Sequence, residues 1–172
     1  MLHHVSFNAH QPNVVAPVLS ELLGAIMFRA PAPPFPANSW LVCFGDNHGS
    51  LIEVMPWGAT RDPMAPGGTA QDCDMRQYSG THLLAATPRS VQDILAIAAH
   101  EGWRAEPGSA GLFQFTKVWI ENAFLIELMT PEQGSAYAAT FNACGLATLD
   151  HKLRKIERAV SGAATTAELS GS

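Results

Sequence analysis

The chain has 172 residues, of which 47% are hydrophobic and 15% are charged, and its formal net charge is −5. This composition is typical of one globular domain, or of two small half-domains around a shared core, and excludes an intrinsically disordered or membrane-embedded chain. No apolar run approaches the roughly 20 residues of a membrane span, and the first basic cluster, at residues 151–158, comes late in an acidic chain. We therefore expect neither a membrane nor a nucleic acid as partner.

The N-terminus and the cysteines point to a cytoplasmic protein. The first residues, MLHHVSF, lack the basic region and apolar stretch of a secretory signal. The chain has three cysteines, which are widely spaced and form no CxxC pair: Cys43, Cys73 and Cys144. This pattern argues against a disulfide framework or a cysteine zinc site, so we expect all three to be packing residues in a reducing cytoplasm.

The first 56 residues predict five elements in the order βαβββ, which we call module one. The helix is indicated by apolar residues at helical spacing between Pro12 and Gly24. The closing hairpin is indicated by two apolar strands around the turn-forming sequence GDNHG. The predicted elements are a strand at 2–8, a helix at 12–23, a strand at 25–29, a proline-rich loop at 30–36, and strands at 39–44 and 50–55.

The same order of elements returns in residues 80–130, which we call module two. Between the modules, residues 57–79 have no periodic pattern and are predicted to be a linker. Residues 131–172 are predicted to form a C-terminal helical extension that ends in a polar, disordered tail. The predicted elements of module two are a strand at 80–86, a helix at 89–102, a strand beginning at 103–106, and a hairpin of strands at 113–120 and 123–129 around Glu121-Asn122.

The last strand of each module carries a carboxylate in an apolar setting. The sequence LIEVM at 51–55 returns as LIELM at 125–129, with Glu53 and Glu127 at the centre. An ionised carboxylate in such a strand costs on the order of several kcal/mol unless a partner offsets its desolvation. The first strands, HHVSF and THLLA, carry a second matched pair, His4 and His82, at nearly equal distances along the chain from the two carboxylates.

Because residues two apart in a strand share a face, each of these strands has one uniformly apolar face and one mixed face. The mixed faces hold His4 with Ser6 and Asn8, Glu53 with Met55, His82 with Leu84, and Glu127 with Met129. A sheet of such strands would curve around a cavity that two imidazoles and two carboxylates enter. This donor set suits Zn²⁺, Ni²⁺, Co²⁺, Mn²⁺ or Fe²⁺, so a shared divalent cation is the hypothesis that explains both carboxylates.

Simpler interpretations of the same residues stay open. Either carboxylate can belong to an edge strand and face water, and either histidine can lie in the core with its ring bonded to a backbone carbonyl. His3 is an alternative to His4, although it shares a face with the apolar Val5. Trp57, directly after the closing hairpin of module one, is the tryptophan expected to contact a ligand.

These residues resemble the ligand pattern of the vicinal oxygen chelate superfamily, which includes glyoxalase I, methylmalonyl-CoA epimerase, extradiol dioxygenases, and fosfomycin- and bleomycin-resistance proteins. The resemblance covers residues 2–131 and rests on LHHVSF, LIEVMP, GTHLLA and LIELMTPE. It implies metal ligands at His4, Glu53, His82 and Glu127. The implied fold is α+β, with two βαβββ modules that form a curved, cup-shaped mixed sheet and helices on the outside.

A complete His/Glu/His/Glu set is similar to that of glyoxalase I. The resemblance implies a metal-dependent lyase or isomerase that acts on a small substrate with vicinal oxygens through an enediolate-like intermediate, with Glu127 or Glu53 moving a proton. The residues expected to bind substrate are Ser6, Asn8, Met55, Trp57, Leu84 and Met129.

Two other functions are compatible with the same scaffold. One is an Fe/Mn extradiol-type dioxygenase, which would use His4, His82 and Glu127. The other is a non-catalytic small-molecule-binding protein of the drug-resistance type. Members of the superfamily close the cup alone or exchange modules across a two-fold axis, so the resemblance also leaves a homodimer open.

Overall fold

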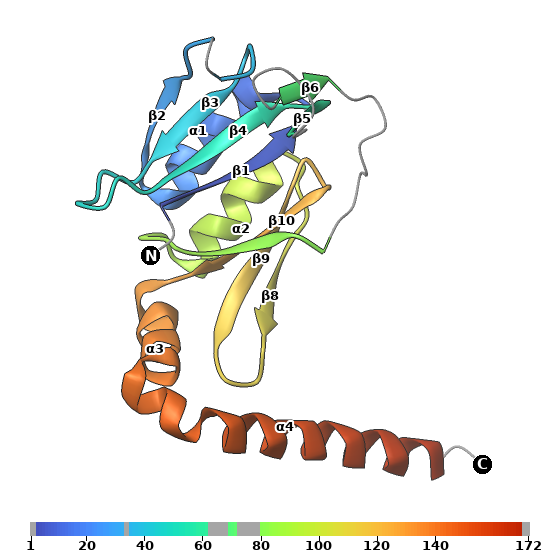
Figure 1. Ribbon diagram of the computed structural model, residues 1–172. Helices are drawn as coiled ribbons and strands as arrows, with labels where there is room; N and C mark the ends of the chain where they lie inside the picture. The colour runs from blue at the N-terminus through green and yellow to red at the C-terminus, as the bar shows by residue number, and fades with distance from the viewer. Residues whose placement is uncertain (1–2, 33–34, 62–68, 72–79, 170–172) are drawn as a thin grey trace.

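The protein consists of two βαβββ modules followed by two helices (Figure 1). The computed structural model describes residues 3–32, 35–61, 69–71 and 80–169. Module one contains β1 (His4–Ala9), α1 (Pro12–Leu23), β2 (Ile26–Arg29), β3 (Trp40–Cys43) and β4 (Leu51–Pro56). Module two contains β7 (His82–Ala86), α2 (Val91–His100), β8 (Ala105–Ser109), β9 (Gln114–Ile120) and β10 (Phe124–Met129). The α+β class and the two βαβββ modules are therefore confirmed.

Each module forms its own four-stranded mixed sheet. The strand orders are β1-β4-β3-β2 and β7-β10-β9-β8, so the first and last strands of each module are neighbours. These neighbours run parallel, because α1 or α2 carries the chain back between them, whereas the remaining pairs are antiparallel. Among the described strands no ladder joins the two sheets, so they do not close into the single cup-shaped sheet that was expected.

One hydrophobic core lies between the helices and one face of each sheet. Val15 and Leu19 of α1 are fully buried in it, together with Ile94 of α2. Phe7 of β1 stacks on Phe124 of β10, with ring centroids 4.3 Å apart and ring planes 3° apart, which joins the modules directly. The mixed faces of β1, β4, β7 and β10 are turned away from this core, as the alternation of residues predicts.

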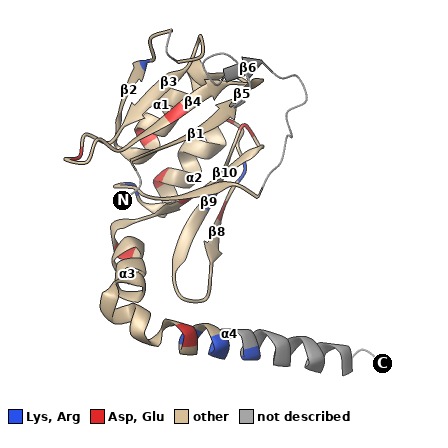
Figure 2. Cartoon of the chain, viewed as in Figure 1, with Lys and Arg blue, Asp and Glu red and all other residues tan. Residues whose placement is uncertain are grey.

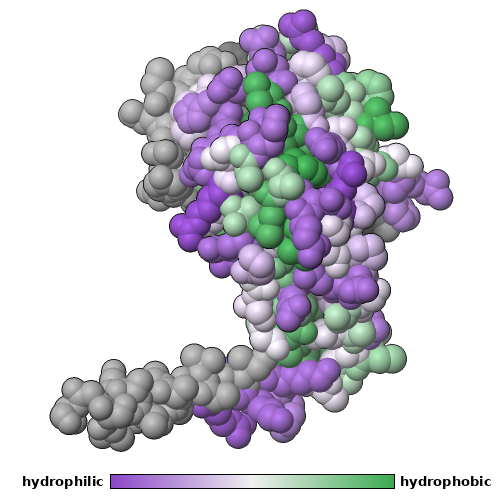
Figure 3. Space-filling view, turned by 180° about the vertical axis from the view of Figure 1, so that it is seen from behind, coloured by the Kyte–Doolittle hydropathy of each residue, from purple (hydrophilic) through white to green (hydrophobic). Residues whose placement is uncertain are grey.

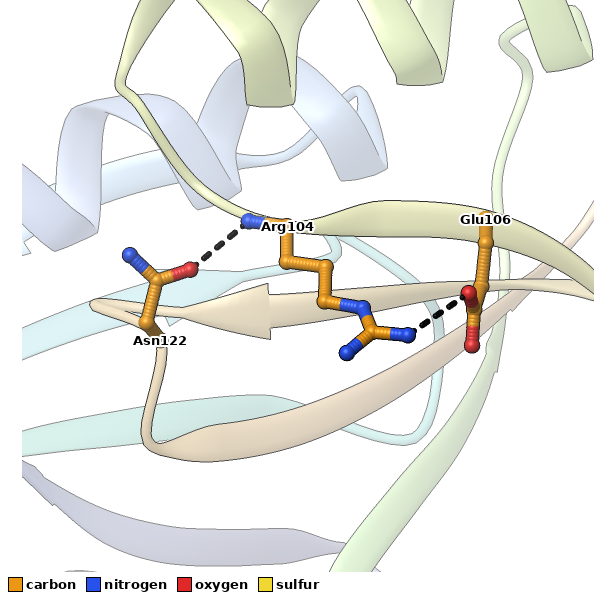
Figure 4. Close-up of polar contacts among 3 residues, drawn as sticks. All are labelled: Arg104, Glu106 and Asn122. Carbon is orange, nitrogen blue, oxygen red and sulfur yellow. Dashed lines mark hydrogen bonds and ion pairs between the residues drawn. The ribbon is translucent and has the colours of Figure 1, made fainter.

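The N-terminus of α1 is capped by module two. Gln11, the residue before the helix, makes no side-chain cap of its own. Instead, the Glu121 carboxylate accepts hydrogen bonds from the backbone N–H groups of His10, at 2.6 Å, and Gln11, at 2.7 Å. Glu121 lies in the loop between β9 and β10, and its neighbour Asn122 accepts a hydrogen bond of 2.8 Å from the Arg104 N–H, which ties this loop to the chain entering β8 (Figure 4).

Module two also caps the C-terminus of α1. The helix ends at Gly24, whose φ of 63° is left-handed and so favours glycine. Arg89 donates from Nε to the carbonyl oxygen of Glu21 at 2.9 Å, and the Thr87 hydroxyl donates to the carbonyl oxygen of Leu22. A carboxylate at the N-terminus and a guanidinium at the C-terminus both complement the helix dipole. Module two therefore fixes α1, and with it the sheet of module one.

Three details differ from the sequence-based expectations. Within the predicted linker, β5 (Ala59–Arg61) and β6 (Thr69–Gln71) form a short antiparallel pair. The loop between β9 and β10 has three residues, 121–123, rather than two. β8 begins at Ala105, later than the predicted strand at 103–106. The rest of the linker lies outside the described residues, as does Cys73; Cys43 and Cys144 are free thiols.

The C-terminal extension forms α3 (Pro131–Phe141) and α4 (Ala143–Leu169). α3 continues from β10 at the edge of module two, and α4 then extends away from both sheets (Figure 1). None of the helices in the described ranges combines the length and the apolar character needed to cross a lipid bilayer.

Candidate metal centre

The two modules place their His and Glu residues in the same register. On the parallel pair β1–β4, His4 lies opposite Leu51, and Glu53 is two residues further along the same face. On the parallel pair β7–β10, His82 lies opposite Leu125, and Glu127 is again two residues further along. Each module therefore contributes one imidazole and one carboxylate, diagonally across neighbouring strands, which we call a half-set.

The half-set of module two is drawn together. Nε2 of His82 lies 3.8 Å from Oε2 of Glu127, and the side chains are 49% and 13% exposed. Nδ1 of His82 is 3.1 Å from the carbonyl oxygen of Gly80. Because a carbonyl oxygen only accepts, Nδ1 is the donor in this contact, and Nε2 is the ring nitrogen that faces the carboxylate. An imidazole nitrogen beside a carboxylate oxygen is a donor pair that suits a shared cation.

The half-set of module one is arranged differently. Glu53 is only 1% exposed, and its Oε2 accepts a hydrogen bond of 2.7 Å from the hydroxyl of Ser6, the residue directly opposite on β1. His4 lies on the same face but is exposed at the start of its strand. The neighbouring His3, the alternative ligand, has its Nδ1 2.7 Å from the carbonyl oxygen of His48.

One chain does not assemble the four donors into one cluster. Within the described ranges, no three His, Cys, Asp or Glu side chains lie close enough together to hold a metal ion. The structure thus brings His82 to Glu127 and Ser6 to Glu53, while the predicted four-donor centre is not formed by a single copy.

The residues expected to bind substrate fall into two groups. Asn8 is engaged by the backbone, since its Nδ2 donates to the carbonyl oxygens of Pro56 at 2.9 Å and Ala59 at 2.7 Å. Trp57 stacks on the ring of His10, with centroids 4.1 Å apart. These two contacts fold the chain after β4 back over the end of β1.

The apolar members of the predicted set are more enclosed. Met55 and Met129, which flank the two carboxylates, are each 6% exposed. Leu84 lines a hollow of about 130 Å³ between the sheets, together with His4 and Leu51. This hollow is lined mainly by aliphatic side chains and opens beside the module-one histidine.

Lys117 is a charged residue of this face that the sequence did not single out. It lies on β9 directly opposite Glu127 on β10 and Glu106 on β8. The pKa of Glu106 is lowered by a hydrogen bond from the Arg104 guanidinium, at 3.0 Å (Figure 4), by the charge of that group and by Lys117. The mixed face of module two therefore carries cations beside its carboxylates, whereas Leu41 takes the place of Lys117 opposite Glu53 in module one.

Comparison with known proteins identifies the fold. No family model matches the sequence, and no curated protein matches it. Among solved structures, the fosfomycin resistance protein FosX from Listeria monocytogenes superimposes with a TM-score of 0.50 at 12% identity, over 76% of this chain and 90% of that chain. A variant of that protein, in complex with Mn(II) and 1S,2S-dihydroxypropylphosphonic acid, gives a TM-score of 0.51 at 12% identity over 78% and 97% of the two chains.

A structure described as a possible glyoxalase from Bacillus cereus is also similar, with a TM-score of 0.45 at 15% identity over 75% and 97% of the two chains. The chain therefore shares the fold of FosX, and the two-module fold that the sequence resemblance implies is confirmed.

Proposed function

We propose that this protein is a divalent-metal-dependent lyase or isomerase that acts on a small substrate with neighbouring oxygens. The observation that carries the proposal is the identical register of the two half-sets, His4 with Glu53 and His82 with Glu127. Glu53 and Glu127 lie on inner strands rather than edge strands. A carboxylate with no shared role has no reason to recur with a histidine at the same offset, whereas metal ligands on duplicated modules do. FosX, which shares the fold, is described with bound Mn(II).

The donors fit a divalent cation in their chemistry but not, within one chain, in their number. Imidazole nitrogen and carboxylate oxygen suit the borderline divalent metals, yet one copy gathers no three of these donors among its described residues. We therefore infer a homodimer in which the half-set of module one meets the half-set of module two from a second copy. His4, exposed at the strand end, would reach the cation from the first copy, and His82 and Glu127 from the second.

The surrounding residues assign the remaining roles. When bound, the cation supplies Lewis-acid polarisation of the two substrate oxygens. Ser6 holds one oxygen of Glu53 by its hydroxyl, which fixes the direction of the carboxylate. Glu53, which is buried beside Met55, would then move the proton at the carbon next to the substrate oxygens, while Glu127 stays with His82 as a ligand. The side chain of Lys117 adds positive charge on the side of Glu127, where an anionic substrate group is favoured.

Titration with Mn(II) tests this proposal without knowledge of the substrate. We expect binding of the free ion, followed by its electron paramagnetic resonance signal, to weaken at least about 100-fold in His82→Ala because a ligand is lost. His100→Ala is the matched control, since His100 also pairs with a glutamate, Glu101, at 2.7 Å but belongs to neither half-set. Equal Mn(II) affinity in His82→Ala and the unmodified protein would rule the proposal out.

A second candidate is a small-molecule-binding protein that needs no metal. It is favoured by the mainly aliphatic hollow of about 130 Å³ and by the lack of a three-donor cluster among the described residues of one copy. Binding of an apolar ligand that survives treatment with a chelator, with no turnover, would support this function against the metal-dependent one.

A further inference from the structure

The helix α4 is an arm with little of the body beside it. It spans 27 residues, or about 40 Å at the rise of an α-helix. The ribbon of α4 extends away from both sheets (Figure 1), and seen from behind, hydrophobic surface lies where the coloured part of the arm meets the rest of the molecule (Figure 3). Leu146 and Leu153 are 54% and 39% exposed, although each is a large apolar side chain. A helix that presents such residues to water gains stability from a partner.

The helix before α4, α3, is packed against module two. Tyr137 and Phe141 of α3 pack edge-on against Phe113 beside the β8–β9 hairpin, with centroids 4.9 Å and 5.8 Å away. At the start of α4, the Asn142 side chain accepts a hydrogen bond of 2.8 Å from the Gly145 N–H, which caps the helix. The arm is therefore held in a defined direction relative to module two.

The apolar residues of α4 recur with the spacing of a coiled coil. The spacings alternate between three and four residues, which is the seven-residue repeat that keeps one narrow stripe facing a partner helix. In the sequence of this helix the stripe positions are Leu146, Leu149, Leu153, Ile156, Val160 and Ala163. The repeat thus covers three heptads in the sequence, and a stripe of this kind favours another helix as the partner.

We propose that α4 pairs with α4 of a second copy as a parallel coiled coil. Charged residues of both signs lie on the described part of the helix (Figure 2). In the heptad set by Leu146 and Leu149, Lys152 occupies the last flanking position, and the sequence places Glu157 five residues later. In a parallel pair these two positions of opposite copies are neighbours, so unlike charges meet twice across the two-fold axis. In an antiparallel pair this alignment is lost.

The segment HKLRKIER at 151–158 of this helix is rich in basic residues, so an anionic membrane surface is the alternative partner. The apolar stripe argues for the second copy, because it is narrow, follows the heptad and carries no aromatic residue. Asp150 and Glu157 also flank the stripe on one side, where a membrane-binding helix carries lysine and arginine. The proposal does not depend on the metal centre, because α4 contributes none of its ligands.

Disulfide trapping in the full-length chain tests the pairing. In a Cys144→Ser background, Leu153→Cys places a thiol on the stripe, and His151→Cys places one on the exposed outer face as the matched control. Under mild oxidation we expect Leu153→Cys to form a covalent dimer at least about tenfold faster than His151→Cys, because pairing raises the local thiol concentration. Equal rates in the two variants would overturn the proposal.

Charge reversal then tests the orientation. Lys152→Glu and Glu157→Lys should each slow the cross-linking of Leu153→Cys, and the two reversals together should restore it. Absence of this rescue would overturn the parallel arrangement.

A sedimentation-equilibrium mass of three or four copies, or co-sedimentation of a monomer with anionic vesicles, would overturn the two-copy arm. Cross-linking of Leu153→Cys should be unchanged when His82→Ala is added, which separates failure of the metal centre from failure of the arm.

Discussion

Glu53 and Ser6 make a buried polar contact on the mixed face of module one. The two residues lie directly opposite on β1 and β4, so the hydroxyl reaches the carboxylate at 2.7 Å without any loop to position it. At 1% exposure, Glu53 obtains little solvation from water, so the hydroxyl of Ser6 supplies a hydrogen bond that bulk water cannot. Ser6 therefore supports both the fold and the direction of the carboxylate.

Ser6→Ala should lower the free energy of unfolding by about 1.5–3 kcal/mol, because a buried carboxylate loses a donor. Urea denaturation monitored by circular dichroism measures this change. Ser6→Thr retains the hydroxyl and should restore most of the stability. If Ser6→Ala and Ser6→Thr were equally stable, the hydroxyl would have no role in holding Glu53.

Asp46 gives the hairpin between β3 and β4 a pH dependence. Its pKa is lowered from 3.8 to about 2, chiefly by hydrogen bonds from the backbone N–H and side chain of Ser50, with a further bond from the His48 N–H. Because the folded-state pKa lies below the unfolded one, the stabilisation is complete above pH 3.8 and is lost as the pH falls towards 2. Carboxyl NMR titration should find Asp46 half-protonated near pH 2, and a midpoint near 3.8 would contradict the turn geometry.

At the scale of single residues, alternation along strands was sufficient to predict which side chains share a face. His4 with Glu53 and His82 with Glu127 lie as the period of two requires. Lys117 could not be placed in the same way. A two-residue loop would have put Thr116 opposite Glu127, and the third loop residue shifts the register by one. Register depends on loop geometry, which composition alone does not fix.

At the scale of elements, α1 depends on caps from the other module. The Glu121 carboxylate accepts hydrogen bonds from two backbone N–H groups where the chain enters the helix. Gln11, the residue before the helix, makes no side-chain cap there. Glu121 and Asn122 hold left-handed φ values of 50° and 55°, which are unfavourable for glutamate and better tolerated by asparagine. This backbone conformation directs the Glu121 carboxylate toward the N-terminus of α1.

Glu121→Ala should therefore destabilise the protein by about 1–2 kcal/mol, as expected for removal of a helix N-cap. Thermal or urea unfolding measures the effect, and Glu101→Ala, which removes only a surface carboxylate paired with His100, is the control. Faster hydrogen exchange of the His10 and Gln11 N–H groups should accompany the loss. Unchanged exchange of these two groups in Glu121→Ala would show that the cap contributes nothing.

The sequence was a good guide to most elements and a poor one to others. Long periodic stretches, such as α1 between Pro12 and Gly24, are specified by burial of one face. β5 and β6 were missed because three-residue strands are too short to show a period. Elements held by distant backbone partners leave no local signal.

At the scale of the whole molecule, duplication determines what can be predicted. Two βαβββ modules with histidines and glutamates in matching positions could be predicted, because each module satisfies its own strand pairing. The relative placement of the modules could not be predicted from the sequence. It rests on contacts between residues far apart in sequence, such as Phe7 with Phe124 and Glu121 with His10. As a result, the sequence predicts four ligands but not that one copy leaves them as two half-sets.

The proposed metal centre requires that half-sets from two different copies share one metal ion. Mixing His4→Ala with His82→Ala tests it most directly, because each variant keeps the half-set that the other has lost. After exchange of subunits, random pairing should restore intact centres at about a quarter of all sites, since a mixed two-fold dimer contains one intact and one doubly damaged centre. Mn(II) binding should reappear in the mixture although neither variant binds alone. No recovery, with subunit exchange verified by mass, would contradict the claim.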